Sequence, residues 1–234
     1  MVAGAIMLLA GCGPLKVSVT TSPDLDKYRV RTLAVMPFDA VETPQVADRQ
    51  DTAVQGPVGV IRSDISLGTP PQVERTGQPT AKVPAAAAAT ITGLVHGHLS
   101  RSKGLTVLSL SSSEREWPTV KNARGGMSVE KAAGQAARRL SADAVLIGRV
   151  LVYQERVGSK WGATPAVVGF EMRVIAADGE TLWIGNYYEQ QRPMGEDFAG
   201  FLERGGVFVT ADELAQYGVD HVLAQFPFGL PPSR

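Results

Sequence analysis

The sequence predicts an α/β fold, a mixed-sheet sandwich in which helices pack on a sheet of parallel and antiparallel strands. Short apolar runs typical of buried strands alternate with two helical patterns in the first half of the chain. Asp178-Gly179 then gives a strong hairpin signal between two longer strand patterns. A capping box over residues 210–213 begins a C-terminal helix. Together these observations predict a C-terminal β-hairpin followed by helices.

The composition is that of an ordinary globular domain and excludes several classes of protein. The 234 residues include 23 basic and 23 acidic side chains. A formal net charge of zero argues against nucleic-acid binding, which normally requires a basic excess. A single cysteine and three histidines argue against a disulfide framework and against a metal site built on several thiolates. We expect no metal, no cofactor and no nucleic-acid partner.

The first eleven residues, MVAGAIMLLAG, form an uncharged apolar run that ends directly before Cys12. The run is shorter than the ~20 apolar residues of a membrane-spanning helix, and it is typical of a signal peptide over residues 1–11. Leu9-Ala10-Gly11-Cys12 resembles the lipobox of bacterial lipoproteins. The resemblance implies that the signal is removed and that Cys12 carries acyl chains such as palmitate, which anchor the chain stably when more than one is present. The alternative is an apolar helix with an incidental cysteine.

The mature chain is expected to begin with a lipidated tether over residues 12–29, followed by one domain over residues 30–228. Residues 31–38 read as a short buried strand that ends at Pro37. Residues 39–83 hold five prolines and no sustained hydrophobic period. We expect this segment to be a long insertion that becomes ordered only against a partner.

Two helices and two further strands follow the insertion. Pro84 precedes an alanine run whose apolar face continues to Leu99, and a short strand follows. Residues 111–127 are charged and contain glycine, so they are interpreted as a loop. Ser128 is the expected N-cap of a helix whose inner face is mostly alanine. Residues 144–153 are almost continuously apolar, as in a central strand buried on both faces.

The hairpin at Asp178-Gly179 is expected to join strands over residues 166–176 and 181–189. A two-residue turn places Val174 opposite Trp183. The face opposite to these two residues is half apolar, and it needs cover from a terminal helix or a neighbouring subunit. The residues expected to contact a partner on this face are Ile175, Leu182, Ile184 and Tyr188.

Three segments resemble a group of bacterial envelope proteins. LAVMPF at residues 33–38 is similar to their opening strand, and ADAVLIGRV at residues 142–150 is similar to a later strand. FEMRVIAADGETLW at residues 170–183 resembles their hairpin. The group includes the curli secretion lipoprotein CsgG, the penicillin-binding-protein activator LpoB and the TolB amino-terminal domain. The resemblance implies a TolB-N/CsgG-like fold and an envelope location, but no single activity, because the members do not share one.

The sequence contains none of the common nucleotide-binding, hydrolase or zinc-protease motifs, and its carboxylates are dispersed. We therefore expect no enzyme and no catalytic residues. His96 and His98 are two residues apart, about 200° around a helix, so they cannot share a metal. Lys160 and Trp161 lie in a glycine-containing loop that can contact a partner or the lipid headgroups. The alternative is a tryptophan folded over the sheet edge.

The expected function is that of a non-enzymatic scaffold or accessory subunit of an envelope assembly for secretion or transport. Cys12 anchors it to the outer membrane, facing the periplasm, since Gly13 rather than aspartate follows the cysteine, as in enterobacterial sorting rules. The expected partners are the membrane, envelope proteins and a second copy of the chain. The alternative is an LpoB-like regulator of a cell-wall synthase. A tether over residues 13–28 extends about 55 Å, which is short for that role.

Overall fold

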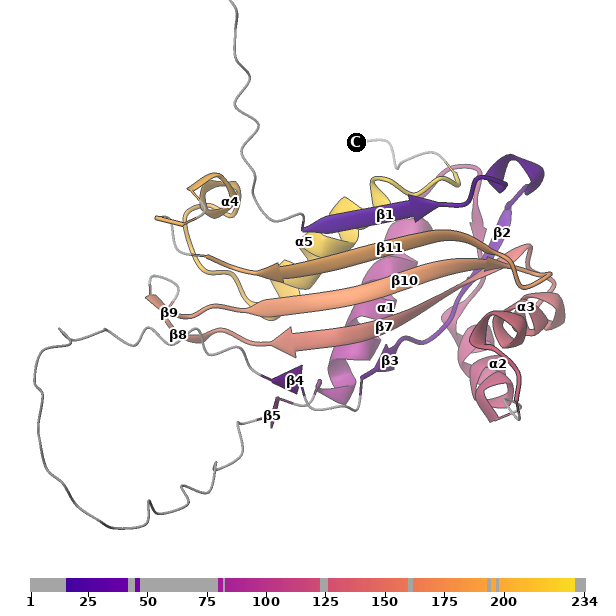
Figure 1. Cartoon of the computed structure of the whole chain (residues 1–234), viewed down its shortest axis with the longest axis horizontal. Coiled ribbons are helices and arrows are strands. Elements are labelled where there is room, and N and C mark those ends of the chain that lie inside the picture. Colours follow the sequence, from indigo (N-terminus) through magenta and orange to yellow (C-terminus); the bar gives the residue numbers. More distant parts are fainter. Residues whose placement is uncertain are drawn as a thin grey trace, which may run out of the picture.

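A mixed sheet forms the centre of the computed structural model (Figure 1). The structure describes residues 16–41, 45–46, 80–81, 83–122, 126–159, 162–192, 195–196 and 198–229. Within these residues the sheet has seven strands in the order β1-β11-β10-β7-β2-β6, and β3 pairs with β7 beside β2. This arrangement confirms the predicted mixed α/β class.

Three long strands are antiparallel neighbours in the middle of the sheet: β7 (Ala144–Gln154), β10 (Val167–Ala176) and β11 (Thr181–Gln190). The predicted register is confirmed, because Val174 lies opposite Trp183. Gly179 in the turn has a φ of 99°, a left-handed conformation that favours glycine. A glycine at this position therefore lets the chain turn tightly between β10 and β11.

The remaining strands of the sheet are short: β1 (Val17–Thr21), β2 (Thr32–Val35), β3 (Asp39–Ala40) and β6 (Thr106–Val107). β2 runs parallel to β7 and β6, and β1 runs antiparallel to β11 at the sheet edge. β1 corrects the predicted tether, because residues 17–21 belong to the sheet. The alternating Val17 and Val19 side chains pack against the main core, which holds this segment on the domain. Only residues 13–16 separate Cys12 from the sheet.

Two small hairpins lie outside the main sheet. β4 (Gln45–Val46) pairs with β5 (Thr80–Ala81), so two points near the ends of the predicted insertion meet. Residues 47–79 lie outside the described part of the chain, and their expected mobility stays a prediction. β8 (Val157–Ser159) pairs with β9 (Gly162–Thr164) beyond the end of β7.

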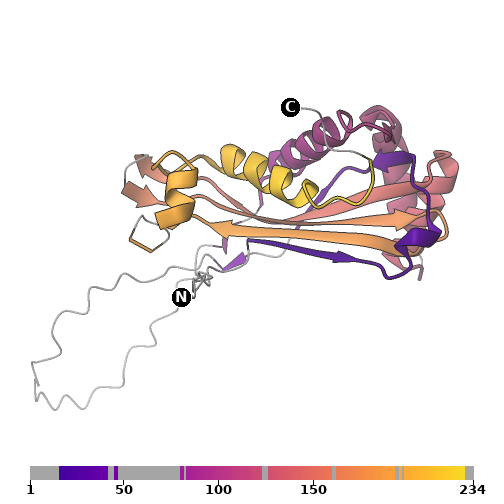
Figure 2. The same ribbon diagram turned by 90° about the horizontal axis from the view of Figure 1, so that it is seen from above.

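The helices cover the two faces of the sheet unequally. Their bounds are η1 (Leu25–Lys27), α1 (Ala85–Leu99), α2 (Leu110–Asn122), α3 (Val129–Arg139), α4 (Phe198–Glu203) and α5 (Ala211–Leu223). α1 and α5 lie side by side over one face, as Figure 2 shows from above. α2 and α3 lie on the opposite face and at one end of it (Figure 1). Among the described residues, no helix lies over the rest of that face.

Two hydrophobic cores follow from this arrangement. The larger core lies between the sheet and α1 and α5, and its largest buried side chains include Trp183, Tyr187 and Phe170. The smaller core contains the alanines of α3 packed against Val145, Ile147 and other residues of the sheet. Small side chains let α3 lie close to the sheet, as predicted from its alanine face.

The predicted helix caps are confirmed. The Ser128 Oγ accepts a hydrogen bond of 3.3 Å from the backbone N–H of Lys131 at the start of α3. At α5, the Thr210 hydroxyl accepts from the backbone N–H of Glu213, and the Glu213 carboxylate accepts from that of Thr210. Each cap satisfies backbone donors that the first turn of a helix leaves unpaired.

α2 corrects the loop predicted over residues 111–127. The helix places Ser113 and Trp117 four residues apart on a buried face. The sequence pattern missed it because Trp117 is the only large apolar side chain in the middle of the segment, and Pro118 suggested a break. The main contact of α2 with the domain is therefore the buried indole of Trp117, and no repeating apolar pattern identifies the helix in the sequence.

The close approach of α5 to β11 gives a direct test of the larger core. A Cβ atom at Gly218 would lie 2.4 Å from the Tyr187 ring, whereas one at Gly93, on α1, would meet nothing within 4 Å. We expect Gly218→Ala to destabilise the domain by about 1–3 kcal/mol through overpacking. The matched control Gly93→Ala should stabilise it by about 0.5–1 kcal/mol, because alanine loses less entropy in a helix. Urea denaturation of both variants measures these differences, and equal effects would contradict the close helix–sheet contact.

Candidate functional site

The structure divides the predicted contact residues into three groups. Ile184 is half-buried and Tyr188 is 55% exposed. Ile175 and Leu182 are fully buried within the domain, so neither is available for the predicted contact with a partner. Cys12, Lys160 and Trp161 lie outside the described residues, and their roles stay predictions.

Ile175 and Leu182 are buried for different reasons. Ile175 keeps the predicted face, opposite to Val174, and α3 covers that end of the face, so Ile175 packs in the smaller core. The register of β10 on β11 shifts between Val174 and Ile175, so Ile175 pairs with Thr181 and Leu182 has no partner in that register. This β-bulge interrupts the strict alternation on β11, and Leu182 joins the larger core.

The uncovered part of the sheet is a mixed polar and apolar surface, which we call the open face. It lies on β1, β11, β10 and β7, on the side away from α1 and α5 (Figure 1). Side chains alternate along each strand, so the neighbours of core-facing residues point to this side. The open face consists of Ser18, Thr20, Arg149, Glu171, Arg173, Ile184, Asn186 and Tyr188.

A chain of ion pairs orders the charged side chains of the open face. The Glu171 carboxylate accepts hydrogen bonds from Arg149, at 3.0 Å, and from Arg173, at 2.9 Å. Arg173 also donates to Glu130 of α3, at 3.3 Å. Partly exposed pairs of this kind contribute little stability, roughly 0.2–1 kcal/mol each. Their effect here is to hold two arginines in defined positions on the surface.

A cleft of about 170 Å³ adjoins the open face between α2, α3 and the sheet. Its walls are Asp39, Trp117, Val129, Ile147, Gly148, Arg149, Glu171 and Arg173. Within the described part of the chain, the Trp117 Nε1 and the Arg173 Nε have no hydrogen-bond partner. Sites for small molecules usually measure about 300–1,000 Å³. The size of the cleft therefore fits one side chain of a partner better than a cofactor.

The histidines take part in local packing contacts. The His98 Nδ1 lies 2.9 Å from an Asp220 carboxylate oxygen, and the His96 Nε2 lies 3.0 Å from the Leu108 carbonyl oxygen. The His221 ring stacks on Tyr217 at 3.8 Å. His96 is therefore held against the domain by a contact with the backbone that precedes α2. Among the described residues, no group of three or more His, Cys, Asp or Glu side chains is placed to hold a metal ion.

The sequence analysis missed a buried charged cluster at the end of β11. The Glu189 side chain is 2% exposed, and it accepts a 2.6 Å hydrogen bond from the Tyr187 hydroxyl and another from the Arg204 guanidinium. The Lys16 Nζ lies 3.5 Å from the same carboxylate. The sequence contains one signal for this cluster: Glu189 comes two residues after the core-facing Tyr187 on the same strand, so both side chains must point to the same face.

This environment changes the ionisation of the tyrosine. Burial raises the pKa of Tyr187 well above its ordinary value, and the negative charge of Glu189 raises it further. Burial and the hydrogen bond to Asp212 likewise raise the pKa of Tyr153, on β7. Both phenols therefore stay protonated in the folded domain at pH values where a free tyrosine ionises, near 10.

Comparison with known proteins shows distant structural neighbours only. No protein-family model and no curated protein matches the chain. The solved structures that are similar include the PelC dodecamer from Paraburkholderia phytofirmans, at 15% identity over 89% of this chain and 94% of that chain, with a TM-score of 0.43. The LpoB C-terminal domain from Salmonella enterica is 14% identical over 72% of this chain and 94% of that chain, with a TM-score of 0.34.

A lipoprotein from Neisseria meningitidis is 16% identical over 74% of this chain and 94% of that chain, with a TM-score of 0.31. With identities of 14–16% and TM-scores below 0.5, these neighbours identify neither a family nor a role for this chain. At these identities and TM-scores, their activities do not transfer to this chain. In the part of the chain that the structure describes, no helix is long and apolar enough to cross a membrane.

The tyrosine cluster predicts a loss of stability in alkali. The unfolded chain releases the Tyr187 proton near pH 10, while the raised pKa keeps it bound in the folded state. The unfolded state then binds fewer protons, so the free energy of unfolding must fall as the pH rises above about 10.

Thermal melts between pH 8 and 11 measure this effect in wild type and Tyr187→Phe. The free energy of unfolding of the variant should be about 1–3 kcal/mol lower than that of wild type at neutral pH, because the buried Glu189 carboxylate loses a hydrogen-bond donor. Above pH 10, the free energy of unfolding of the variant should fall less steeply with pH than that of wild type. Tyr188→Phe, which removes an exposed phenol, serves as the matched control and should keep the wild-type profile. Parallel profiles for wild type and Tyr187→Phe would contradict the protonated, buried phenol.

Proposed function

We propose that this chain is a lipoprotein of the bacterial outer membrane that faces the periplasm and acts as a non-enzymatic scaffold or accessory subunit of a secretion or transport assembly. The observation that carries the proposal is the open face, on which ordered arginines and an exposed tyrosine lie where no described helix covers the sheet. An uncovered, mixed surface of this kind marks a place where another protein packs. The occupant is either another envelope protein or a second copy of the chain.

The chemistry of the open face suits a protein partner. Arginine and tyrosine are enriched among the residues that dominate binding energy at protein interfaces. Arg149 and Arg173 are oriented by Glu171, so they lose little additional freedom when a partner binds. The adjoining cleft can receive one side chain of that partner. These features bind and position a partner, and none of them performs chemistry on a substrate.

The short link to Cys12 favours a scaffold close to the membrane. A chain of five peptide steps from Cys12 to Val17 spans at most about 18 Å. The domain of an anchored protein must then stay near the lipid surface. A regulator that activates a cell-wall synthase at a distance needs a longer reach, so this alternative ranks second.

The anchor is tested by Cys12→Ala. We expect the variant to move from the membrane fraction into the soluble periplasmic fraction, because no thiol remains to accept the lipid. Cell fractionation measures the change, and mass spectrometry of the N-terminal peptide of wild type should show acyl groups on Cys12. Cys12→Ser is the conservative control and should behave like Cys12→Ala. Retention of both variants in membranes, without acyl mass on wild type, would contradict the anchor.

The partner surface is tested by photo-crosslinking in cells. A photoreactive amino acid at Ser18, on the open face, should capture a partner, whereas the same group at Ala89, exposed on α1, should not. Tyr188→Ala should weaken the purified complex by about 2 kcal/mol, or roughly thirtyfold in Kd. Capture of secretion or transport components supports the proposal, and a second copy is confirmed by sedimentation. Capture of a peptidoglycan synthase would favour the regulator instead, and equal capture from both positions would contradict a role for the open face.

A further inference from the structure

We infer that the end of the domain formed by α4 and β8 rests in the headgroup layer of the membrane, where Val157, Phe198 and Leu202 insert. This inference rests on the proposed acylation of Cys12. It adds an orientation to the anchor, because a lipid on Cys12 alone leaves the domain free to turn. It also gives a function to apolar side chains that neither core uses.

The exposed apolar side chains are gathered at one end of the molecule. Among the described residues, the large apolar side chains with the greatest exposure are Val157 at 67%, Phe198 at 61%, Tyr188 at 55% and Leu202 at 54%. Phe198 and Leu202 are four residues apart on α4, so they project from the same side of that helix. α4 and β8 lie at the end of the sheet opposite to α2 and α3 (Figure 1). Among the described residues, the opposite end of the domain, at the β10–β11 turn, has no comparable group.

Hydrogen bonds and a ring contact hold α4 and β8 together as one surface. The Arg156 guanidinium, next to Val157, donates to the carbonyl oxygen of Phe208 at 3.3 Å. The Phe208 ring packs edge-on against Phe201 of α4, with ring centroids 5.9 Å apart. Arg204, directly after α4, donates to the Gly200 carbonyl oxygen and to the buried Glu189. The three exposed apolar residues are therefore carried by a connected structure.

The start of the described chain lies at this same end. The carbonyl oxygen of Lys16 accepts a 3.0 Å hydrogen bond from the backbone N–H of Tyr188, and the Lys16 Nζ lies 3.5 Å from Glu189. Glu189 in turn binds Arg204 beside α4. Cys12 is four residues before Lys16, so its Cα lies within about 14 Å of that residue. An acyl group on Cys12 therefore brings this end of the domain to the lipid surface, and not the end at the β10–β11 turn.

The interfacial layer is the environment in which these side chains are most stable. Each leaflet has a polar layer outside the ≈ 30 Å hydrocarbon core, and phenylalanine and leucine enter its boundary when a protein lies on the surface. α4 has six residues, so it is too short to lie in the membrane as an independent helix. Insertion is therefore limited to side chains, while the backbone stays with the domain. The connected contacts hold these side chains in position before they meet the lipid.

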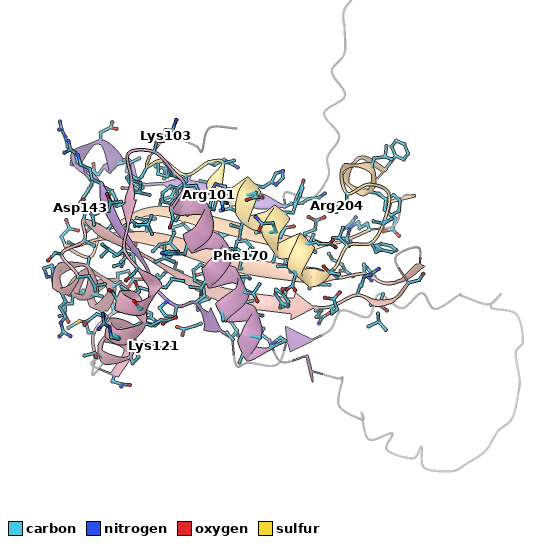
Figure 3. All side chains as sticks on the ribbon, turned by 180° about the vertical axis from the view of Figure 1, so that it is seen from behind. Arg101, Lys103, Lys121, Asp143, Phe170 and Arg204 are labelled. Carbon is cyan, nitrogen blue, oxygen red and sulfur yellow. The ribbon has the colours of Figure 1, made fainter. Side chains whose placement is uncertain are left out.

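The test uses the full, acylated chain in vesicles of phosphatidylethanolamine and phosphatidylglycerol. Cys12 is the only cysteine and its thiol is consumed by the lipid, so one added cysteine gives a single labelling site. An environment-sensitive fluorophore is placed at Leu202→Cys, with Lys103→Cys as the matched control. Lys103 is exposed and lies toward the opposite end from Arg204 (Figure 3). Val157→Cys gives a second, independent reporter at the α4 and β8 end.

We expect the labels at positions 202 and 157 to show blue-shifted emission and quenching by brominated lipids, while the label at 103 shows neither. Phe198→Ser should reduce the quenching at position 202, whereas Ala89→Ser should leave it unchanged. Water-like emission at both 202 and 157 on a chain with verified acyl mass would overturn the inference while leaving the anchor intact. A blue shift without quenching by brominated lipids would also overturn it, because the apolar end would then be covered by protein. Absence of acyl mass would overturn the proposed anchor itself.

Discussion

The carboxylate of Glu189 imposes the constraint on which the end of this domain near α4 depends. A charge with 2% exposure is costly unless donors surround it, and removal of one partner from such a buried pair typically costs about 3–5 kcal/mol. Tyr187, Arg204 and Lys16 supply the hydrogen bonds and opposite charge. These groups come from the middle of the sheet, from the turn after α4 and from the residue before β1. One buried charge thereby joins the edge strand, the small helix and the exit of the chain toward Cys12.

Unequal cover of the two sheet faces gives the molecule its second organising feature. α1 and α5 bury one face over most of its length, while α2 and α3 reach only one end of the other. The open face that remains has a charged middle, in which Glu171 joins Arg149 and Arg173, and an aromatic side chain, Tyr188, toward the end near α4. In the proposed orientation this face stands beside the membrane rather than on it. A lipid contact and a protein contact can then be made at the same time by different parts of the surface.

Much of the fold could be predicted because its signals are local. Asp178-Gly179 marks the turn of the hairpin, in which Val174 lies opposite Trp183 as predicted, and Ser128 and Thr210 mark helix starts through hydrogen bonds to the next turn. The candidate site was predicted only in part. Ile184 and Tyr188 lie on the open face, whereas α3 covers Ile175, and Leu182, at a β-bulge, belongs to the larger core. Neither the position of α3 over the sheet nor the bulge follows from the alternation of side chains within the hairpin.

By itself, the sequence determined the mixed α/β class, the hairpin and the position of a motif that resembles a lipobox, since each depends on residues close together in the chain. Only the tertiary structure decided that residues 17–21 complete the sheet, because an edge strand with two valines acquires its partner 170 residues away. The structure also decided that α2 is a helix, through burial of Trp117 against the smaller core. The tertiary structure also brings Lys16, Glu189 and Arg204 together at one end of the domain. That end is defined by long-range pairing of charges and strands, and such pairing has no signature in any short stretch of residues.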